Sequence, residues 1–333
     1  MLNIALIGCG RIGRMHAELV QANPRSRLVS VHDVNPDAVA ALIGEAQIKS
    51  AASPEEIFAD PDVDAIIVAS VTSTHADYIE ASVAAGKPVL CEKPIDLDIA
   101  RVKSCQAAIA GSDVPVQIGF NRRFDPGHRA LRDAVSAGEI GKLVQLIVTS
   151  RDPSPPGRDY LTGAGGMIRD MTIHDFDLAR FILGDDEPVE LWATGAPLID
   201  PGMAEIDEID CAMIVMRTAA GRQICINNAR QAPYGYDQRV EAVGSDGMLQ
   251  STNRTSHGLV RFGAAATEVQ MPYHTFFIER YRDAFVAQLT GFLDKVSGQA
   301  ADIPLFDDGL KALALAEAAY RALSSGKVEP IET

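Results

Sequence analysis

The stretch NIALIGCGRIG at residues 3–13 decides the fold of the first half of this 333-residue chain. Residues 3–7 form an apolar run that predicts a short buried strand, and three glycines follow at once in the spacing Gly-x-Gly-x-x-Gly. A helical pattern continues from Ile12, and a second apolar strand at residues 28–33 ends in Asp33. In this order of strand, glycine turn, helix, strand and acidic residue, the motif indicates a dinucleotide-binding unit.

Each part of this unit has a physical role in such a site. Gly8 permits the tight turn, Gly10 lets a pyrophosphate approach the backbone, and Gly13 lets helix and strand pack closely. The pyrophosphate would lie on the helix N-terminus, where free N–H groups favour anions. Asp33 would accept hydrogen bonds from ribose hydroxyls and repel a 2′-phosphate, which predicts NAD rather than NADP. Arg11 and Arg14 could shift that preference. In the alternative interpretation the glycines only make a turn and Asp33 only ends a strand.

Three further strands continue the alternation with helices, at residues 65–69, 87–91 and 114–119. They carry no polar alternation, as expected of a parallel sheet covered on both faces. We therefore predict a doubly wound parallel sheet within a domain of residues 1–120. Thr72, Ser73 and His75 follow the strand at 65–69 and are candidate cofactor contacts; alternatively, residues 72–74 only supply a helix cap.

Glu92, Lys93 and Pro94 directly follow the strand at 87–91. Pro94 favours an extended conformation at Lys93, which holds this lysine at the carboxyl edge of the sheet, where ligands bind. A lysine there can donate to a substrate hydroxyl and stabilise negative charge on its oxygen. The alternative is a solvated surface lysine paired with Glu92.

After Phe120 the pattern changes to longer, partly alternating strands at residues 143–150, 189–194, 210–217, 223–229 and 238–243. We predict an α+β domain over residues 121–333 with a large, mostly antiparallel sheet whose open face a homo-oligomer could cover. The Pro-rich residues 151–160 read as a loop, and residues 276–296 and 309–323 read as helices.

A helix is also expected from Met167 to Leu183. Asp170 and His174 are four residues apart and would lie on one face of it. A carboxylate one turn from an imidazole can fix its tautomer and raise its basicity, as a proton-abstracting pair requires. In the alternative interpretation, Asp170 only favours the helix dipole and His174 is only partly buried.

Composition limits the possible functions. The formal net charge of -15 disfavours nucleic-acid binding, since the surface would repel phosphates. We find no apolar run of roughly 20 residues that would suggest a membrane helix, and no signal-peptide pattern. The five cysteines are irregularly spaced, which predicts reduced thiols in the cytoplasm and no metal site.

Several motifs together resemble the Gfo/Idh/MocA oxidoreductase family over nearly the whole chain. They are GCGRIG at residues 8–13, CEKP at 91–94 and Asp170-x-x-x-His174-Asp175. Longer stretches at residues 119–125, 150–153, 170–177 and 234–237 look like the bacterial inositol dehydrogenases within that family.

The resemblance implies NAD-dependent oxidation of myo-inositol to 2-keto-myo-inositol. In this interpretation His174 accepts the hydroxyl proton, Asp170 orients His174, and Lys93 polarises the reacting oxygen. The implied cofactor-binding residues are Gly8, Gly10, Arg11, Ile12, Gly13, Asp33, Thr72, Ser73, His75, Glu92 and Lys93. The implied substrate contacts are Lys93, Arg122, Asp152, Asp170, His174 and Tyr236, although a structural salt bridge would explain Arg122 and Arg123 equally well.

The resemblance further implies that residues 121–333 bind substrate and form a homotetramer. Other hypotheses remain open at this point. The substrate could be scyllo- or chiro-inositol or a pyranose sugar, and a non-catalytic NAD-binding sensor or scaffold could keep the same fold.

Overall fold

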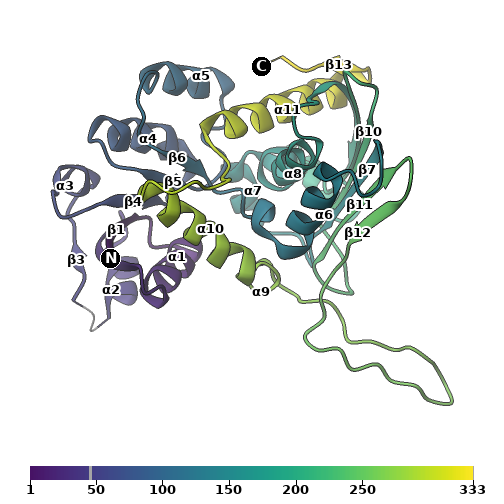
Figure 1. Ribbon diagram of the computed structural model, residues 1–333, viewed down its shortest axis with the longest axis horizontal. Helices are drawn as coiled ribbons and strands as arrows, with labels where there is room; N and C mark the ends of the chain where they lie inside the picture. Colours follow the sequence, from purple (N-terminus) through teal and green to yellow (C-terminus); the bar gives the residue numbers. More distant parts are fainter. Residues whose placement is uncertain (45–46, 333) are drawn as a thin grey trace. The chain divides into compact units, whose positions relative to one another are not determined.

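The computed structural model describes residues 1–44 and 47–332, which form two compact units (Figure 1). Unit 1 comprises Met1–Asn121 and Phe285–Leu313, and unit 2 comprises Arg122–Ala284 and Ala314–Thr333. The segment 285–313 lies in the second half of the sequence but belongs to unit 1. Leu289, Phe292 and Leu293 lie on one helix of this segment and are buried in the hydrophobic core of unit 1. Burial of these apolar side chains brings the segment back to unit 1.

Unit 1 is built on the six strands β1 (Leu2–Ile7), β2 (Ser26–His32), β3 (Lys49–Ser50), β4 (Ala65–Val68), β5 (Val89–Cys91) and β6 (Val116–Ile118). Their order is β3-β2-β1-β4-β5-β6, and every pairing is parallel. The predicted doubly wound sheet is confirmed. Because strand order reverses between β1 and β4, a ligand crevice is expected at the carboxyl ends of these strands. The short β3 was not predicted.

Helices α1 (Arg11–Ala22), α2 (Pro36–Ile43), α3 (Pro54–Ala59), α4 (His75–Ala84) and α5 (Ile99–Ala108) connect these strands. All four residues of β4 are buried, as are the last four of β1. Such continuous burial explains why these segments are apolar runs without polar alternation.

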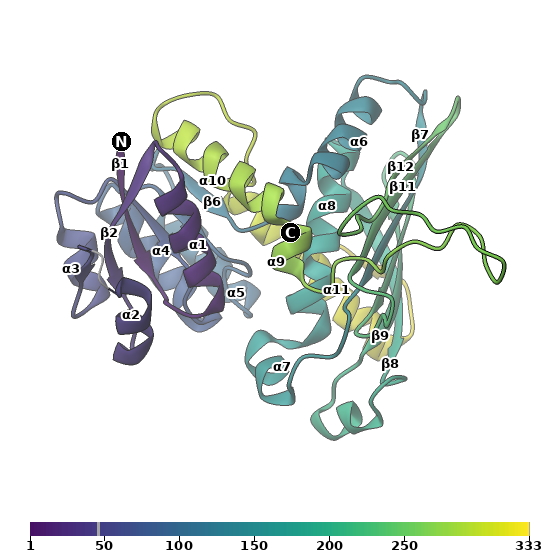
Figure 2. The same ribbon diagram turned by 90° about the horizontal axis from the view of Figure 1, so that it is seen from below.

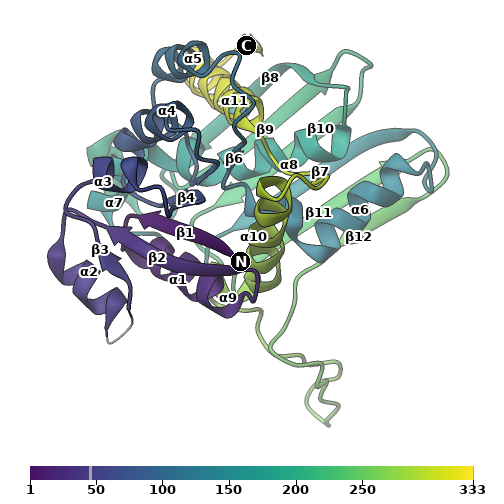
Figure 3. The ribbon, with the colours of Figure 1, turned by 60° about the vertical axis from the view of Figure 1, so that its left-hand side comes forward.

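Unit 2 contains β7 (Leu143–Arg151), β8 (Pro188–Ala196), β9 (Cys211–Thr218), β10 (Gln223–Ala229), β11 (Asp237–Gly244), β12 (Met248–Ser251) and β13 (Glu329–Pro330). They form one sheet in the order β12-β11-β7-β10-β9-β8-β13 (Figure 3). All pairings are antiparallel except that of β7 with β10. The predicted mostly antiparallel sheet is confirmed, while the short β12 and β13 were not predicted.

Helices α6 (Pro126–Ser136) and α8 (Ile173–Leu183) lie along one face of this sheet (Figure 2). Strand β9 alternates buried and exposed residues, as a sheet covered on one face requires. Large apolar side chains remain exposed at alternating strand positions, including Trp192, Met213 and Val215.

Four predicted boundaries differ from the observed ones. Residues 158–160 are not loop, because the Pro and Gly run ends at Gly157 and α7 (Arg158–Ala164) begins directly after it. The helix expected over 167–183 begins with a π-helical turn at Ile168–Thr172 before α8. The helix expected over 276–296 is split at the buried Tyr281 into α9 (Phe277–Arg280) and α10 (Arg282–Val296). The last helix, α11 (Phe306–Ser325), starts three residues before the predicted position.

No helix within residues 1–44 and 47–332 combines the length and the apolar character needed to cross a membrane.

The glycine loop after β1 yields a stability prediction. A Cβ atom at Gly13 would overlap the carbonyl oxygen of Gly8, whereas one at Gly10 would meet no heavy atom within 4 Å. We expect Gly13→Ala to lower the free energy of unfolding by about 1–3 kcal/mol, because helix α1 must move away from the turn. Gly10→Ala, the matched control, should stay within about 0.5 kcal/mol of the parent chain. Urea denaturation measures both, and equal stability of the two variants would contradict this account.

Candidate functional site

The glycine loop of unit 1 has the features of an anion cradle. Gly8 has a φ of +99°, and a Cβ there would overlap the carbonyl group of Ala69. Helix α1 begins after Gly10 without a side-chain cap and without an acidic residue in its first turn. Its first N–H groups are therefore not capped by a side chain, and the space around Gly10 is open. These features fit the pyrophosphate of a dinucleotide.

Asp33 holds this loop in place. Its carboxylate accepts hydrogen bonds from the backbone N–H of Cys9 at 2.6 Å and of Asn35 at 2.8 Å. Arg14 braces the same loop by donating from Nε to the Cys9 carbonyl oxygen at 3.3 Å. Asp33 thus does more than end a strand, and its contact with a ribose stays a prediction. Among its neighbours in the motif, Arg11 is exposed and Ile12 half-buried.

The loop after β4 carries Thr72, Ser73 and His75. Thr72 and Ser73 lie in a 3₁₀ turn and are half-buried and exposed, respectively. His75 is buried, which lowers its pKa, and its ring nitrogens lie 2.8 Å from the carbonyl oxygen of Pro94 and 3.1 Å from that of Ser70. His75 therefore ties the loop after β4 to the loop after β5. Cofactor contacts by these three residues stay predictions.

Glu92 and Lys93 follow β5, as expected. Glu92 Oε1 lies 2.7 Å from Nε2 of His16, a buried residue of α1. A Cβ at Gly119, the residue after β6, would lie 2.6 Å from Glu92 Oε2, so glycine leaves room there for the Glu92 carboxylate. Lys93 is half-buried and precedes a cis bond to Pro94. The sequence analysis did not single out His16. Its position one turn after Gly13 on α1 places it near the glycine loop and could have marked it as a candidate.

In unit 2, every residue of α8 is buried except His174, which is half-buried. Two hydrogen bonds to Asn228 of β10 hold the start of this helix. Thr172 Oγ1 lies 2.7 Å from Asn228 Oδ1, and Asn228 Nδ2 donates to Asp175 at 2.8 Å. The helix can therefore present only His174 to a ligand. Asp170 lies in the preceding π-helical turn, which has more residues per turn than an α-helix. The prediction that residues four apart share one helix face therefore does not apply directly to Asp170 and His174.

The two arginines at the start of unit 2 form buried salt bridges. Nη1 of Arg122 donates to Asp175 and to Ser150 Oγ, the latter at 2.8 Å. Arg123 donates from Nε and Nη2 to both oxygens of Asp177. Burial alone would lower the pKa of Arg122, but the Asp175 carboxylate, together with Tyr281, Tyr236 and Asp152, raises it above its usual value. The salt-bridge interpretation of this pair is thus confirmed.

The Asp170 carboxylate is bound by two residues that sequence reasoning missed. Arg230 Nη2 donates to Asp170 Oδ2 at 3.0 Å, and the Tyr160 hydroxyl donates to Oδ1 at 3.0 Å. Arg230 Nη1 also donates to Asp152 at 2.9 Å, so one guanidinium joins two predicted site residues. Burial raises the pKa of Asp152 although Arg230 faces it.

Tyr236 directly precedes β11 and is buried, which raises the pKa of its hydroxyl. Its ring meets that of Tyr281 edge-on, with 6.0 Å between the ring centroids. Its backbone N–H donates to the carbonyl oxygen of His274 at 2.7 Å. The predicted contact of Tyr236 with a polyol is not tested by these interactions.

Lys93 belongs to unit 1, whereas Asp170 and His174 belong to unit 2. The meeting of these three side chains at one carbinol therefore stays a prediction.

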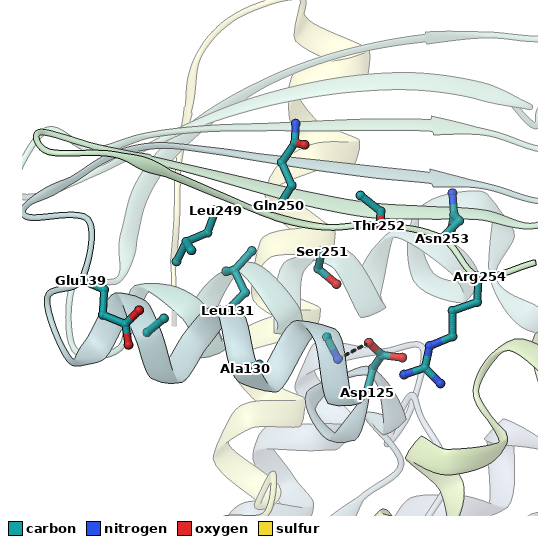
Figure 4. A pocket seen from close by; sticks show the side chains of 12 residues that line it. Asp125, Ala130, Leu131, Glu139, Leu249, Gln250, Ser251, Thr252, Asn253 and Arg254 are labelled. Carbon is teal, nitrogen blue, oxygen red and sulfur yellow. Dashed lines mark hydrogen bonds between the residues drawn. The ribbon is translucent and has the colours of Figure 1, made fainter. Parts of the chain in front are cut away.

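A cavity of about 630 Å³ in unit 2 lies apart from these residues (Figure 4). It opens between α6 and β12 and is lined by residues such as Leu131, Ser251 and Arg254. None of the predicted site residues lines it. In the part of the chain that the structure describes, no three His, Cys, Asp or Glu side chains gather in a way that could hold a metal ion.

Comparisons with known proteins agree with this geometry. A family model described as an oxidoreductase family with an NAD-binding Rossmann fold matches residues 2–120, and the GFO/IDH/MocA C-terminal domain matches residues 128–250. The inositol 2-dehydrogenase of Rhizobium meliloti (strain 1021) is 42% identical over 97% of this chain and 97% of its own.

Solved structures are similar over the full chain. A myo-inositol dehydrogenase from Corynebacterium glutamicum matches with a TM-score of 0.94 at 42% identity, covering 100% of this chain and 99% of that one. The scyllo-inositol dehydrogenase of Lactobacillus casei with bound NAD(H) and scyllo-inositol matches with a TM-score of 0.91 at 26% identity, covering 100% of both chains.

The buried pair of Arg122 and Asp175 yields a prediction. Asp175→Ala would leave the buried guanidinium without its carboxylate, so the free energy of unfolding should fall by about 3–5 kcal/mol. Asp175→Asn should cost less, since the amide oxygen still accepts a hydrogen bond. Glu190→Ala removes the partner of Arg217 in an exposed pair and should change stability little. Urea unfolding at neutral pH compares the three variants, and an equal loss for Asp175→Ala and Glu190→Ala would refute this account.

Proposed function

This chain belongs to the Gfo/Idh/MocA oxidoreductase family, and we propose that it is an NAD-dependent inositol 2-dehydrogenase that oxidises myo-inositol to 2-keto-myo-inositol. The observation that carries the proposal is the 42% identity with an inositol 2-dehydrogenase over 97% of both chains. The chain also has the chemical groups that the reaction needs, namely the glycine loop of unit 1, the half-buried His174, and Asp170 four residues before it, which Arg230 anchors.

NAD fits unit 1 because the loop around Gly10 is open and the start of α1 is uncapped. When bound, NAD supplies the nicotinamide ring that accepts a hydride from the substrate carbon. The loop 8–13 would hold the pyrophosphate and Asp33 the adenosine ribose. We further assign the loops carrying Thr72, Ser73, His75, Glu92 and Lys93 to the nicotinamide end of the cofactor.

In the proposed reaction His174 accepts the proton of the hydroxyl group at the carbon that loses the hydride. The Asp170 carboxylate stabilises the imidazolium that this transfer creates. Lys93 donates a hydrogen bond to the reacting oxygen and stabilises its negative charge until the carbonyl group forms. Asp152 would bind a further hydroxyl, because its side chain is 19% exposed despite its bond to Arg230.

We assign Arg122 and Tyr236 to the wall of the polyol site. Both are buried, and Arg122 is already paired with Asp175. They would contribute to the shape and polarity of the polyol site, whereas Asp152, Asp170 and His174 would contact the hydroxyl groups of the polyol directly.

We also propose a cytoplasmic homotetramer in which residues 121–333 bind the substrate and form the subunit contacts. The exposed apolar side chains of the unit 2 sheet support this proposal, since contact with another subunit would remove them from water. The cysteines Cys9, Cys91, Cys105, Cys211 and Cys225 are all free, which agrees with a reducing compartment.

The purified protein tests the function directly. With NAD and myo-inositol it should produce NADH absorbance, and a flat trace would refute the proposed substrate. A panel of scyllo-inositol, chiro-inositol and aldoses, compared by kcat/KM, separates the rival substrates. A sensor or scaffold would bind NAD and turn over none of them.

His174→Ala should lower kcat by roughly two to four orders of magnitude, because the reaction loses its general base. NAD binding, measured by calorimetry, should stay intact because His174 lies in unit 2. His257→Ala removes an exposed histidine of the same unit and serves as the matched control. Unchanged turnover of His174→Ala would show that another group takes the proton.

Asp33→Ser should shift the ratio of kcat/KM for NAD over NADP toward NADP, since the carboxylate that repels a 2′-phosphate is lost. Because this carboxylate also binds the N–H groups of Cys9 and Asn35, the variant should lose some thermal stability. Asp33→Asn keeps an acceptor oxygen for the loop and is the control for that loss. An unchanged cofactor ratio in both variants would mean that a different residue reads the ribose.

A further inference from the structure

Arg230 is a buried arginine of unit 2 whose two terminal nitrogens bind two different carboxylates. Nη1 donates to Asp152 Oδ2 at 2.9 Å and Nη2 donates to Asp170 Oδ2 at 3.0 Å. The Nε–H group is buried and has no hydrogen-bond partner. A buried donor is left unsatisfied only when other contacts fix the group. The two carboxylates therefore set the orientation of this guanidinium.

The backbone around Arg230 is fixed as well. Strands β7 and β10 are parallel neighbours, with Ala229 opposite Arg151, so Asp152 and Arg230 are the first residues beyond the paired ends. The N–H of Asp152 donates to the Ala229 carbonyl oxygen at 2.9 Å, and the N–H of Arg230 donates to that of Asp210 at 2.8 Å. Asp170, in contrast, comes from the π-helical turn before α8. Arg230 thus connects the carboxyl ends of the central strands β7 and β10 to the segment that carries Asp170 and His174.

We propose that Arg230 is a positioning residue of the polyol site, which keeps Asp170 ionised beside His174 and sets the separation of Asp170 from Asp152. This inference rests on the proposed function for its kinetic consequence. Arg230 need not touch substrate or cofactor, since it acts through the two carboxylates.

The charges around Asp170 support this role. Arg230 at the end of β10, Asp152 at the end of β7 and Tyr160 on α7 all act on the Asp170 carboxylate. His174 follows four residues later on the same segment. The Tyr160 side chain is exposed, but partial loss of hydration at its hydroxyl and the Asp170 carboxylate that this hydroxyl binds raise its pKa, so this residue stays a neutral donor. Arg230 is a permanent cation bound to both carboxylates, so it opposes the mutual repulsion of Asp152 and Asp170; Arg122 also acts on Asp152.

The test is the pH profile of kcat/KM for inositol oxidation in Arg230→Gln and Arg230→Lys. Without the guanidinium, Asp170 should hold its proton to a higher pH. The acid limb of the Arg230→Gln profile should therefore move up by roughly one pH unit or more. Arg230→Lys keeps a charge but cannot bind both carboxylates in the same geometry, so its limb should move less. The affinity for NAD should not change.

Arg180→Gln is the matched control. Arg180 is a buried arginine of α8 that donates from Nε and Nη2 to Glu187. Its loss should lower the melting temperature and leave the acid limb in place. If Arg230→Gln lowers the melting temperature like Arg180→Gln and its limb stays at the parent position, the arginine is only structural and the proposal is overturned.

A second readout keeps this inference separate from the proposed function. The carboxyl carbon of Asp170 can be assigned in ¹³C-aspartate spectra by its disappearance in Asp170→Asn, and then titrated. Its midpoint should be higher in Arg230→Gln than in the parent chain, even if the parent turns over no polyol. An unchanged midpoint overturns the proposal whatever the activity, whereas an inactive parent with a shifted midpoint overturns the inositol dehydrogenase assignment alone.

Discussion

The buried carboxylate of Asp175 is the contact on which the site of unit 2 depends. It binds Arg122 from the segment after unit 1 and Asn228 from β10, and it lies one residue after His174. A buried charge is tolerated only when it is paired and hydrogen-bonded. The bonds of Asp175 to Arg122 and Asn228 therefore fix the position of α8 against the sheet. Since all other residues of α8 are buried, this position also determines where His174 points. The orientation of the proposed base is thus a consequence of packing and ion pairing beneath it.

In unit 1, too, polar side chains near the predicted site bind other parts of the protein, mostly backbone groups. Asp33 binds the N–H of Cys9 in the glycine loop, His75 faces the carbonyl groups of two loops, and Glu92 binds His16 on α1. Each of these side chains joins the carboxyl end of one strand to a neighbouring loop or helix. Loops held in this way keep their shape before a ligand arrives, so less ordering is needed on binding. A residue can therefore serve a dinucleotide site while its own polar atoms bind protein.

The sequence predicted what depends on local pattern. The strand and glycine motif at residues 3–13, the buried run of β4 and the half-buried strands of unit 2 all follow from periodicity and turn chemistry. It did not predict Arg230, because its role requires β7 and β10 to be parallel neighbours within a sheet that otherwise reads as antiparallel. Likewise, the return of residues 285–313 to unit 1 depends on packing against strands that lie far earlier in the sequence. Long-range pairing leaves no local signal at the residues that use it.

Charge explains why the positions of these carboxylates matter for the proposed substrate. The chain carries a net charge of -15, but an inositol is neutral, so long-range attraction cannot select it. Stereoisomers of an inositol also have the same volume and the same number of hydroxyl groups, so a hydrophobic pocket would discriminate poorly among them. Discrimination must come from polar atoms that are satisfied by one arrangement of hydroxyls and left unpaired by another. Such selection works only if the acceptors cannot move to follow the wrong isomer, and a guanidinium bound to both Asp152 and Asp170 provides that restraint.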